Sequence, residues 1–130
     1  MDEIILRMKD ITKSFPGVKA LKGVSMELRK GEVHALLGEN GAGKSTLIKC
    51  LGGIYPIDSG SIELDGKKAD IRTPGDSMKL GISVIHQELV LAEQLTVADN
   101  IFMGLEPVNK AGFIDKKKIF GDCEGILQSL

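Results

Sequence analysis

A glycine-rich stretch of eight residues, Gly38–Ser45, constrains this chain more than any other feature. It reads Gly-Glu-Asn-Gly-Ala-Gly-Lys-Ser and fits the phosphate-binding pattern of Gly, four residues, Gly-Lys and Ser or Thr. The short apolar run 33–37 before it is typical of a buried parallel strand. After it, apolar residues at helical spacing predict a helix over 46–51 that stops at Gly52-Gly53. Strand, glycine loop and helix in this order are the context in which the motif binds phosphate.

The residue types in this loop suit the binding of a triphosphate. Glycines let backbone N–H groups crowd around an anion, and the start of the following helix aims its unpaired N–H groups at the same point. Lys44 adds a charge that reaches the outer phosphates, and the hydroxyl of Ser45 is a ligand for Mg²⁺. We therefore assign Lys44, Ser45, Thr46 and the N–H groups of 40–44 to triphosphate and Mg²⁺ binding. The alternative, a plain glycine turn before a core helix, is disfavoured by the flanking strand and helix.

Composition excludes several classes of function. The chain has 130 residues, 42% hydrophobic and 27% charged, as expected of one ordinary globular domain. A net charge of −1 does not indicate a basic surface that would bind nucleic acid. We interpret Lys116–Lys118 as a solvated helix face. Cys50 and Cys123 have neither metal-ligand nor disulfide spacing, which fits a reduced cytosolic setting. No apolar stretch approaches the roughly 18–20 residues of a membrane span and no secretory signal is evident, so we expect any link to a membrane to run through a partner.

The remainder of the chain predicts short strands and helices in alternation. We expect strands at 4–9, 21–28, 33–37 and 81–86, a turn region at 10–17, a hairpin over 61–68 that turns at Asp65-Gly66, and helices at 74–80 after the cap Thr73, at 97–102 after the cap Thr96 and at 116–130. The last of these helices carries an apolar stripe that continues to Leu130. Because nothing follows to cover this stripe, we expect the sequence to stop inside a fold.

Order and spacing over nearly the whole chain resemble the ATP-binding subunits of ABC transporters. Segment 30–47 resembles the phosphate-loop region of that family almost residue for residue, and 59–66 resembles the hairpin that the family places after the loop helix. Phe15, roughly 23 residues before the loop, stands where the family has an aromatic residue that stacks on adenine. Gln87 stands at the family's glutamine that contacts Mg²⁺ or water and reports the nucleotide state to the permease.

The motif and the resemblance together define a set of candidate site residues for ATP and Mg²⁺. They assign nucleotide contacts to Phe15, Gly38, Glu39, Asn40, Gly41, Ala42, Gly43, Lys44, Ser45 and Thr46, catalytic roles to Lys44 and Gln87, and Mg²⁺ ligation to Ser45 and Gln87. We expect the Glu39 carboxylate to point away from the anion, because like charges repel. His34 is expected to be a packed core histidine, Asp65 a turn residue, and His86 a structural residue without a catalytic role.

The resemblance implies an α/β fold: an incomplete P-loop NTPase core of the ABC ATPase type with an antiparallel β-subdomain. The β-subdomain is expected at about 1–30 and 59–72, and the core at about 31–58 and 73–130. The family's signature sequence, its Mg²⁺-binding aspartate and catalytic glutamate, and its switch histidine do not occur in these 130 residues. We therefore expect an N-terminal portion of the first ATPase half of a longer subunit, which binds ATP without turning it over efficiently.

A narrower resemblance connects the chain to bacterial carbohydrate importers of the ribose, xylose and galactose type, in which one polypeptide carries two ATPase halves. It rests on 15–21, 52–55 and 104–115, with a departure at Leu105, where an arginine is usual. It implies ATP hydrolysis coupled to sugar import, with transmembrane permease subunits, the second ATPase half and, indirectly, an external sugar-binding protein as partners, and no nucleic acid. The implied location is cytoplasmic, on the inner face of the membrane through the permease.

Two other classes of function stay open at this point. One is a P-loop kinase or GTPase, although the hairpin at 59–66 and Gln87 are not what those folds place there. The other is a non-catalytic ATP-binding module. The prediction of import rather than export rests on the resemblance alone. The sequence does not specify the sugar, because the permease and the binding protein recognise it.

Overall fold

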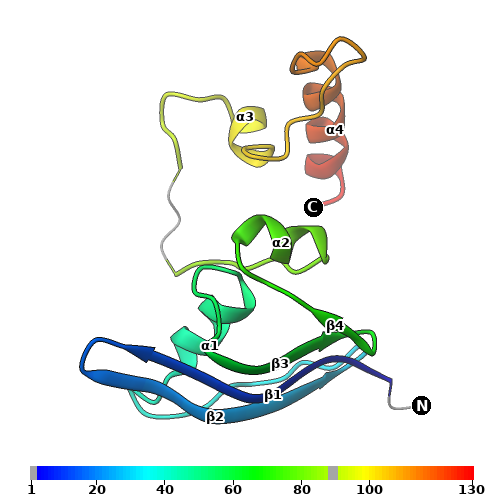
Figure 1. Cartoon of the computed structure of the whole chain (residues 1–130). Coiled ribbons are helices and arrows are strands. Elements are labelled where there is room, and N and C mark those ends of the chain that lie inside the picture. The colour runs from blue at the N-terminus through cyan, green and yellow to red at the C-terminus, as the bar shows by residue number, and fades with distance from the viewer. Residues whose placement is uncertain (1–2, 88–90) are drawn as a thin grey trace. The chain divides into compact units, whose positions relative to one another are not determined.

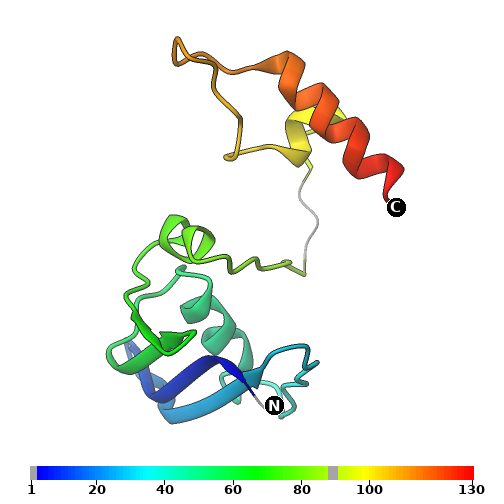
Figure 2. The same cartoon turned by 90° about the vertical axis from the view of Figure 1, so that its right-hand side faces the viewer.

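The computed structural model describes residues 3–87 and 91–130, and the chain divides into two compact units, Met1–Ile85 and His86–Leu130 (Figures 1 and 2). Each unit contains its own cluster of buried apolar side chains. Across the part of the chain that is described, no helix is long and apolar enough to be a membrane span.

The first unit is built on an antiparallel sheet (Figure 1). Its strands are β1 (Ile4–Phe15), β2 (Val18–Arg29), β3 (Ser59–Leu64) and β4 (Lys67–Ala69), and within the described residues their order is β2-β1-β3-β4. The predicted antiparallel β-subdomain is therefore confirmed. The first two strands are longer than expected, and most of the region predicted as a turn at 10–17 belongs to β1.

Two tight turns set the register of this sheet. Phe15 pairs with Val18, so the first hairpin turns on Pro16-Gly17 alone, with Gly17 at a φ of 78°. Proline followed by a residue of positive φ is the sequence of a type II turn. The second hairpin turns on Asp65-Gly66, where φ is 48° and 73°, the positive pair that a type I′ turn requires. The predicted hairpin and the assignment of Asp65 to its turn are confirmed.

Helix α1 (Lys44–Leu51) packs on one face of the sheet, as Figures 1 and 2 both show. Its buried residues Leu47 and Cys50 join an apolar cluster with side chains of the strands and the segments that follow them, namely Leu6, Met8, Ile11, Leu21, Ile62, Ala69 and Ile71. Burial raises the pKa of the Cys50 thiol, because the charged thiolate loses its hydration. The helix ends at Gly52, as predicted.

Helix α2 (Pro74–Lys79) is attached to the C-terminal end of α1 through two contacts. The buried hydroxyl of Ser77 donates a hydrogen bond of 2.9 Å to the Leu51 carbonyl. Gly53 has a φ of 75°, and a Cβ at this position would overlap the Thr73 carbonyl. Only glycine combines that φ with so close an approach of two backbones.

The predicted strands at 33–37 and 81–86 are not strands in the structure. Within the described residues, neither segment forms a ladder with any strand. Val33 and Leu37 are 98% and 88% exposed, while Leu36 and Ile82 rest against the apolar cluster. The physical reason is that a strand needs a hydrogen-bonded neighbour, which an apolar sequence alone cannot supply.

His34, which lies within the first of these segments, also differs from expectation. It is exposed rather than packed in a core, and its Nδ1 lies 3.1 Å from Glu32 Oε1. The pKa of the Glu32 carboxyl is lowered, mainly by the hydrogen bond that it accepts from the Arg29 N–H and also by the contact with His34.

The second unit pairs helix α3 (Val97–Ile101) with helix α4 (Lys116–Gln128). Thr96 caps α3 by accepting a hydrogen bond from the Asp99 N–H, and Asp115 caps α4 by accepting one from the Lys118 N–H. The predicted helices and the Thr96 cap are thus confirmed. The apolar cluster consists of Ala98, Ile119 and Cys123 with Phe102 beside them. On the predicted stripe of α4, Phe120, Ile126, Leu127 and Leu130 are exposed.

Candidate functional site

The glycine loop leads into the N-terminus of α1, which is left open to an incoming anion. The helix begins at Lys44, and its N-cap residue is Gly43, with a φ of 94°. In the described structure this cap makes no side-chain hydrogen bond and the first turn contains no acidic residue. The first N–H groups of α1 are therefore available to an anion, in the direction in which the helix dipole also favours negative charge.

Gly43 also fixes the loop against the sheet. A Cβ at this position would lie 2.7 Å from the Ala20 carbonyl oxygen and 2.9 Å from Leu21 Cδ2. The absence of a side chain lets the loop backbone rest directly on β2. Since β2 and α1 belong to the same apolar cluster, the start of the helix and the strand beside it are held as one surface.

Lys44 folds its side chain back across the loop. Its Nζ donates hydrogen bonds of 2.5 Å to the Gly38 carbonyl and 2.7 Å to the Glu39 carbonyl. An ammonium group has three donors, so one remains for an external acceptor while the other two hold the charge over the loop. This arrangement places a cation at the loop without a carboxylate partner in the contacts described.

The loop, the start of α1 and the hairpin between β1 and β2 enclose a groove of about 540 Å³. It is lined by Phe15, Val18, Lys19, Ala20, Asn40, Gly41, Gly43, Lys44, Ser45 and Thr46. The structure therefore brings most of the candidate nucleotide contacts to one groove. Gly38, Glu39 and Ala42 lie in the loop but do not line this groove.

Three lining residues, Val18, Lys19 and Ala20, were not anticipated from the sequence. They begin β2 directly after the Pro16-Gly17 turn, and the signal that could have found them is that turn itself. A two-residue turn places Val18 opposite Phe15, so a site that includes Phe15 also includes Val18.

The chemical character of the groove suits a polyanion with an apolar end. None of the lining residues that the structure describes carries a carboxylate, and two of them, Lys19 and Lys44, carry ammonium groups. Backbone N–H groups and the hydroxyls of Ser45 and Thr46 complete a set of donors, while Phe15 supplies an aromatic surface. These groups fit a nucleoside triphosphate, and the Ser45 hydroxyl fits Mg²⁺, which takes few protein ligands and uses phosphate oxygens for the rest.

Gln87 belongs to the second unit, at its beginning, and its side chain is exposed. Its assignment to catalysis and to Mg²⁺ ligation therefore stays a prediction, as do the individual roles of the groove residues. His86 is likewise exposed in that unit. In the described ranges, no cluster of His, Cys, Asp and Glu side chains has the makings of a separate metal site.

Comparison with known proteins identifies close relatives over the whole chain. The protein family described as "ABC transporter" matches residues 21–129. The xylose import ATP-binding protein XylG of Thermoanaerobacter pseudethanolicus is 51% identical over 100% of this chain and 26% of its own length. The galactose/methyl galactoside import ATP-binding protein MglA of Clostridium tetani is 50% identical over 99% of this chain and 26% of its own length. The chain thus spans about a quarter of the length of these curated relatives.

Solved structures of the same family share the fold. A nucleotide-free ATP-binding cassette from an ABC transporter is 33% identical, with a TM-score of 0.70, over 90% of this chain and 45% of that one. The ADP conformation of MJ1267, an ATP-binding cassette of an ABC transporter, is 38% identical, with a TM-score of 0.57, over 60% of this chain and 31% of that one. The fold is therefore that of part of an ABC ATPase, a P-loop fold with an antiparallel sheet.

Proposed function

The chain belongs to the ABC transporter family, and from this premise we propose that it forms the nucleotide-binding portion of an ATP-driven carbohydrate importer. One observation carries the proposal at the level of the site. The groove joins a phosphate loop that carries an ammonium group to the aromatic ring of Phe15. A triphosphate and a nucleobase need these two surfaces at the two ends of one site.

The roles of the groove residues follow from their chemistry. The N–H groups of 40–44 and the Lys44 ammonium hold the phosphates, Ser45 and Thr46 donate hydroxyls, and Phe15 lies against adenine. Mg²⁺, when bound, neutralises charge on the outer phosphate oxygens. Ser45 would hold it through its hydroxyl, and Gln87 remains the second ligand predicted from the sequence.

The substrate class is proposed from the relatives. XylG and MglA are named for the import of xylose and of galactose or methyl galactoside, and a similar protein from Jannaschia sp., 49% identical over 99% of this chain and 25% of its own length, for the import of ribose. We infer that the chain serves sugar import with permease subunits, a second ATPase half and an external sugar-binding protein, on the cytoplasmic face of the membrane. The domain division into a β-subdomain at 1–30 and 59–72 and a core in the remaining residues belongs to the same proposal.

The proposal is tested by equilibrium binding of Mg-ATP, Mg-GTP and Mg-tripolyphosphate to the 130-residue chain, measured by calorimetry. Lys44→Ala is expected to lower the affinity for all three ligands by roughly 10-fold or more, because it removes charged hydrogen bonds to the phosphates. Phe15→Ala is expected to lower the affinity for ATP by roughly 3–10-fold and to leave the affinity for tripolyphosphate unchanged, because only the base contacts the ring. Lys68→Ala, an exposed lysine of β4, is the matched control for loss of a positive charge.

Two results would contradict the proposal. Unchanged binding in Lys44→Ala would show that the loop does not hold the phosphates. If GTP and ATP bind with equal affinity, and Phe15→Ala changes neither, the assignment of Phe15 to an adenine site is wrong. For the chain alone we propose binding without efficient turnover, and steady phosphate release that Lys44→Ala abolishes would overturn that part.

A further inference from the structure

Phe15 does not stand alone in the lining of the groove. The ring of Tyr55 meets it at a centroid distance of 5.0 Å and an interplanar angle of 73°. This is the edge-to-face geometry that aromatic pairs prefer. Phe15 lines the groove and Tyr55 does not, so Tyr55 contacts the ring from outside the groove.

A cation also contacts the Phe15 ring. Lys13 Nζ lies 5.7 Å from the ring centroid, within the range of a cation–π contact. The same ammonium forms an ion pair of 2.9 Å with Asp58 Oδ1. The Lys13 side chain is only 11% exposed, so the pair holds it in one place rather than leaving it in solvent. Lys13 and Phe15 are two residues apart on β1 and share one face of the sheet.

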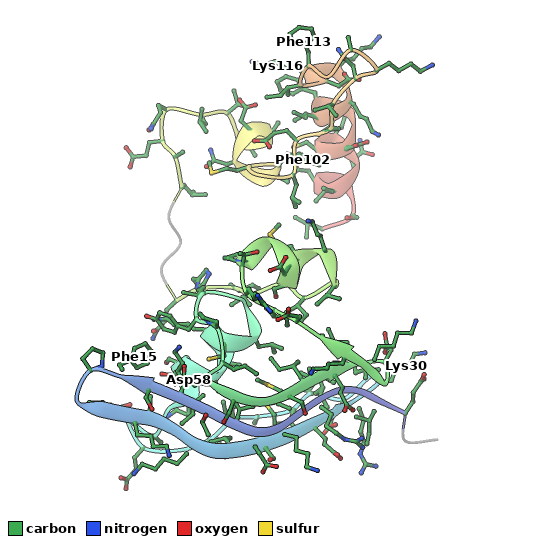
Figure 3. All side chains as sticks on the ribbon, viewed as in Figure 1. Phe15, Lys30, Asp58, Phe102, Phe113 and Lys116 are labelled. Atoms are coloured by element: carbon green, nitrogen blue, oxygen red, sulfur yellow. The ribbon has the colours of Figure 1, made fainter. Side chains whose placement is uncertain are left out.

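Asp58 also holds the backbone that carries Phe15. Its Oδ2 accepts a hydrogen bond of 2.6 Å from the Ser14 N–H, and its own N–H donates one of 2.9 Å to the Thr12 carbonyl. The pKa of the Asp58 carboxyl is lowered by the hydrogen bond from Lys13 and then by that from Ser14, so the carboxylate stays charged at neutral pH. Figure 3 marks Phe15 and Asp58 at the same end of the sheet. The last residues of β1 are thus tied to the start of β3 just before the chain turns at Pro16-Gly17.

We propose that Tyr55 and the Lys13–Asp58 ion pair are positioning residues that set the Phe15 ring for the nucleobase. The proposal rests on the nucleotide site proposed above and deepens it, because it names what orients the base-binding surface. A half-buried aromatic ring beside a hairpin turn could otherwise sample several rotamers, and the entropy lost on ordering it would lower the affinity for the ligand. The three contacts remove that freedom before the ligand arrives.

The test is a double-mutant cycle on the binding of Mg-ATP and Mg-tripolyphosphate. Tyr55→Ala is expected to lower the affinity for ATP by roughly 3–10-fold, the size of the contribution that one aromatic pair makes. The affinity for tripolyphosphate is expected to stay unchanged. In the background of Phe15→Ala, the same substitution is expected to cause no further loss, because Tyr55 acts through Phe15. Tyr55→Phe keeps the ring and is expected to retain wild-type binding.

Matched controls separate positioning from general loss of packing. Ile57→Ala removes another half-buried side chain from the edge of the same apolar cluster, and is expected to leave the preference for ATP unchanged. Asp58→Ala is expected to reproduce the loss seen with Tyr55→Ala. Asp70→Ala breaks an exposed ion pair with Arg72 elsewhere in the first unit and is expected to have no effect on ATP binding.

A second readout does not need a nucleotide. Tyr55 is the only tyrosine of the chain and there is no tryptophan, so tyrosine fluorescence anisotropy and the tyrosine band of the near-ultraviolet circular dichroism spectrum report on this ring. Phe15→Ala and Asp58→Ala are expected to lower the anisotropy and the dichroic signal of Tyr55, and Asp70→Ala to leave both unchanged.

The outcomes distinguish this proposal from the proposed function. If the wild-type chain fails to bind ATP, the proposed function fails and the base subsite with it. If ATP binds and depends on Lys44 and Phe15, but the effects of Tyr55→Ala and Phe15→Ala add, Tyr55 does not act through Phe15 and only the positioning proposal is overturned. Equal weakening of ATP and tripolyphosphate by Tyr55→Ala would also overturn it, since that pattern indicates a general loss of structure.

Discussion

At Gly43, backbone conformation and packing both demand a residue without a side chain. Its φ of 94° lies in the left-handed region, and its Cα approaches the Ala20 carbonyl. Gly41, two residues earlier, has a φ of 86° but faces open space. The two glycines of one motif therefore serve different purposes. One permits a turn, and the other also lets the loop rest on the sheet.

This difference predicts different costs for the same substitution. Gly41→Ala is expected to lower the free energy of unfolding by about 1–2 kcal/mol, the cost of a left-handed alanine. Gly43→Ala is expected to cost more and to weaken ATP binding, because β2 or the loop must move to admit the methyl group. Urea unfolding and calorimetric titration measure both effects. Equal costs at the two positions would show that the contact with Ala20 does not hold the loop.

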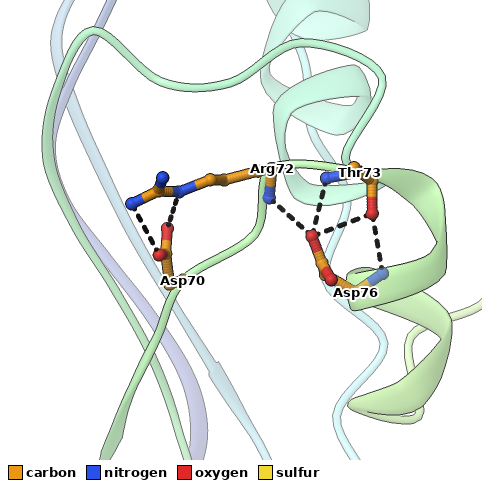
Figure 4. A network of polar contacts seen from close by, with 4 residues as sticks. All are labelled: Asp70, Arg72, Thr73 and Asp76. Atoms are coloured by element: carbon orange, nitrogen blue, oxygen red, sulfur yellow. Dashed lines mark hydrogen bonds and ion pairs between the residues drawn. The ribbon is translucent and has the colours of Figure 1, made fainter.

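At the scale of elements, local hydrogen bonds decide where the helices begin. Figure 4 shows the start of α2, where the Thr73 hydroxyl accepts a hydrogen bond of 3.2 Å from the Asp76 N–H. The Asp76 carboxylate accepts from the Thr73 N–H at 2.9 Å and from its hydroxyl at 2.8 Å. The Arg72 N–H also donates to this carboxylate, at 3.2 Å. The pKa of the Asp76 carboxyl is lowered mainly by the hydrogen bond from the Thr73 hydroxyl, and further by those from the N–H groups of Arg72 and Thr73. The arrangement is a capping box.

Thr73→Ala is therefore expected to destabilise the first unit by about 0.5–2 kcal/mol, the usual cost of losing an N-cap. Thr73→Ser keeps the hydroxyl and is expected to retain most of that stability. Arg72→Ala removes only an exposed ion pair with Asp70 and is expected to change stability by less than about 1 kcal/mol. Chemical denaturation of the three variants tests this order. A loss in Arg72→Ala as large as that in Thr73→Ala would contradict it.

At the scale of the whole molecule, the described residues form two apolar clusters, one in each unit, and the clusters differ in size. The first combines strands, α1 and neighbouring segments, whereas the second consists of Ala98, Ile119 and Cys123 with Phe102 beside them. A small cluster has few contacts to lose, so the second unit is expected to open more easily than the first.

Ile119→Ala tests this expectation. Ile119 is 1% exposed, and its truncation is expected to cost about 2–5 kcal/mol within its own cluster. Hydrogen exchange, followed by mass spectrometry, is expected to lose protection mainly in α3 and α4, with the strands of the first unit little changed. Phe120→Ala, at an exposed neighbouring position, is the control and is expected to have little effect. Loss of protection in β1 to β4 equal to that in α4 would show that the two units unfold as one.

Features governed by neighbours along the chain were predictable from the sequence. The phosphate loop, the helix after it, the caps at Thr73 and Thr96 and the turn at Asp65-Gly66 all follow from contacts within a few residues. The resemblance also anticipated the family, and the family match decides against a kinase or a GTPase of another P-loop family. What the sequence determined by itself was therefore the loop, the local elements and the family.

Only the tertiary structure decided features that depend on distant neighbours. The segment 33–37 has the composition of a buried strand, yet it pairs with no strand of the described residues, and His34 within it is exposed. The contact of Tyr55 with Phe15 joins two segments that periodicity does not connect. The physical reason is that strand pairing and side-chain packing are non-local, so the partner of a strand or a ring is set by the fold and not by adjacent sequence.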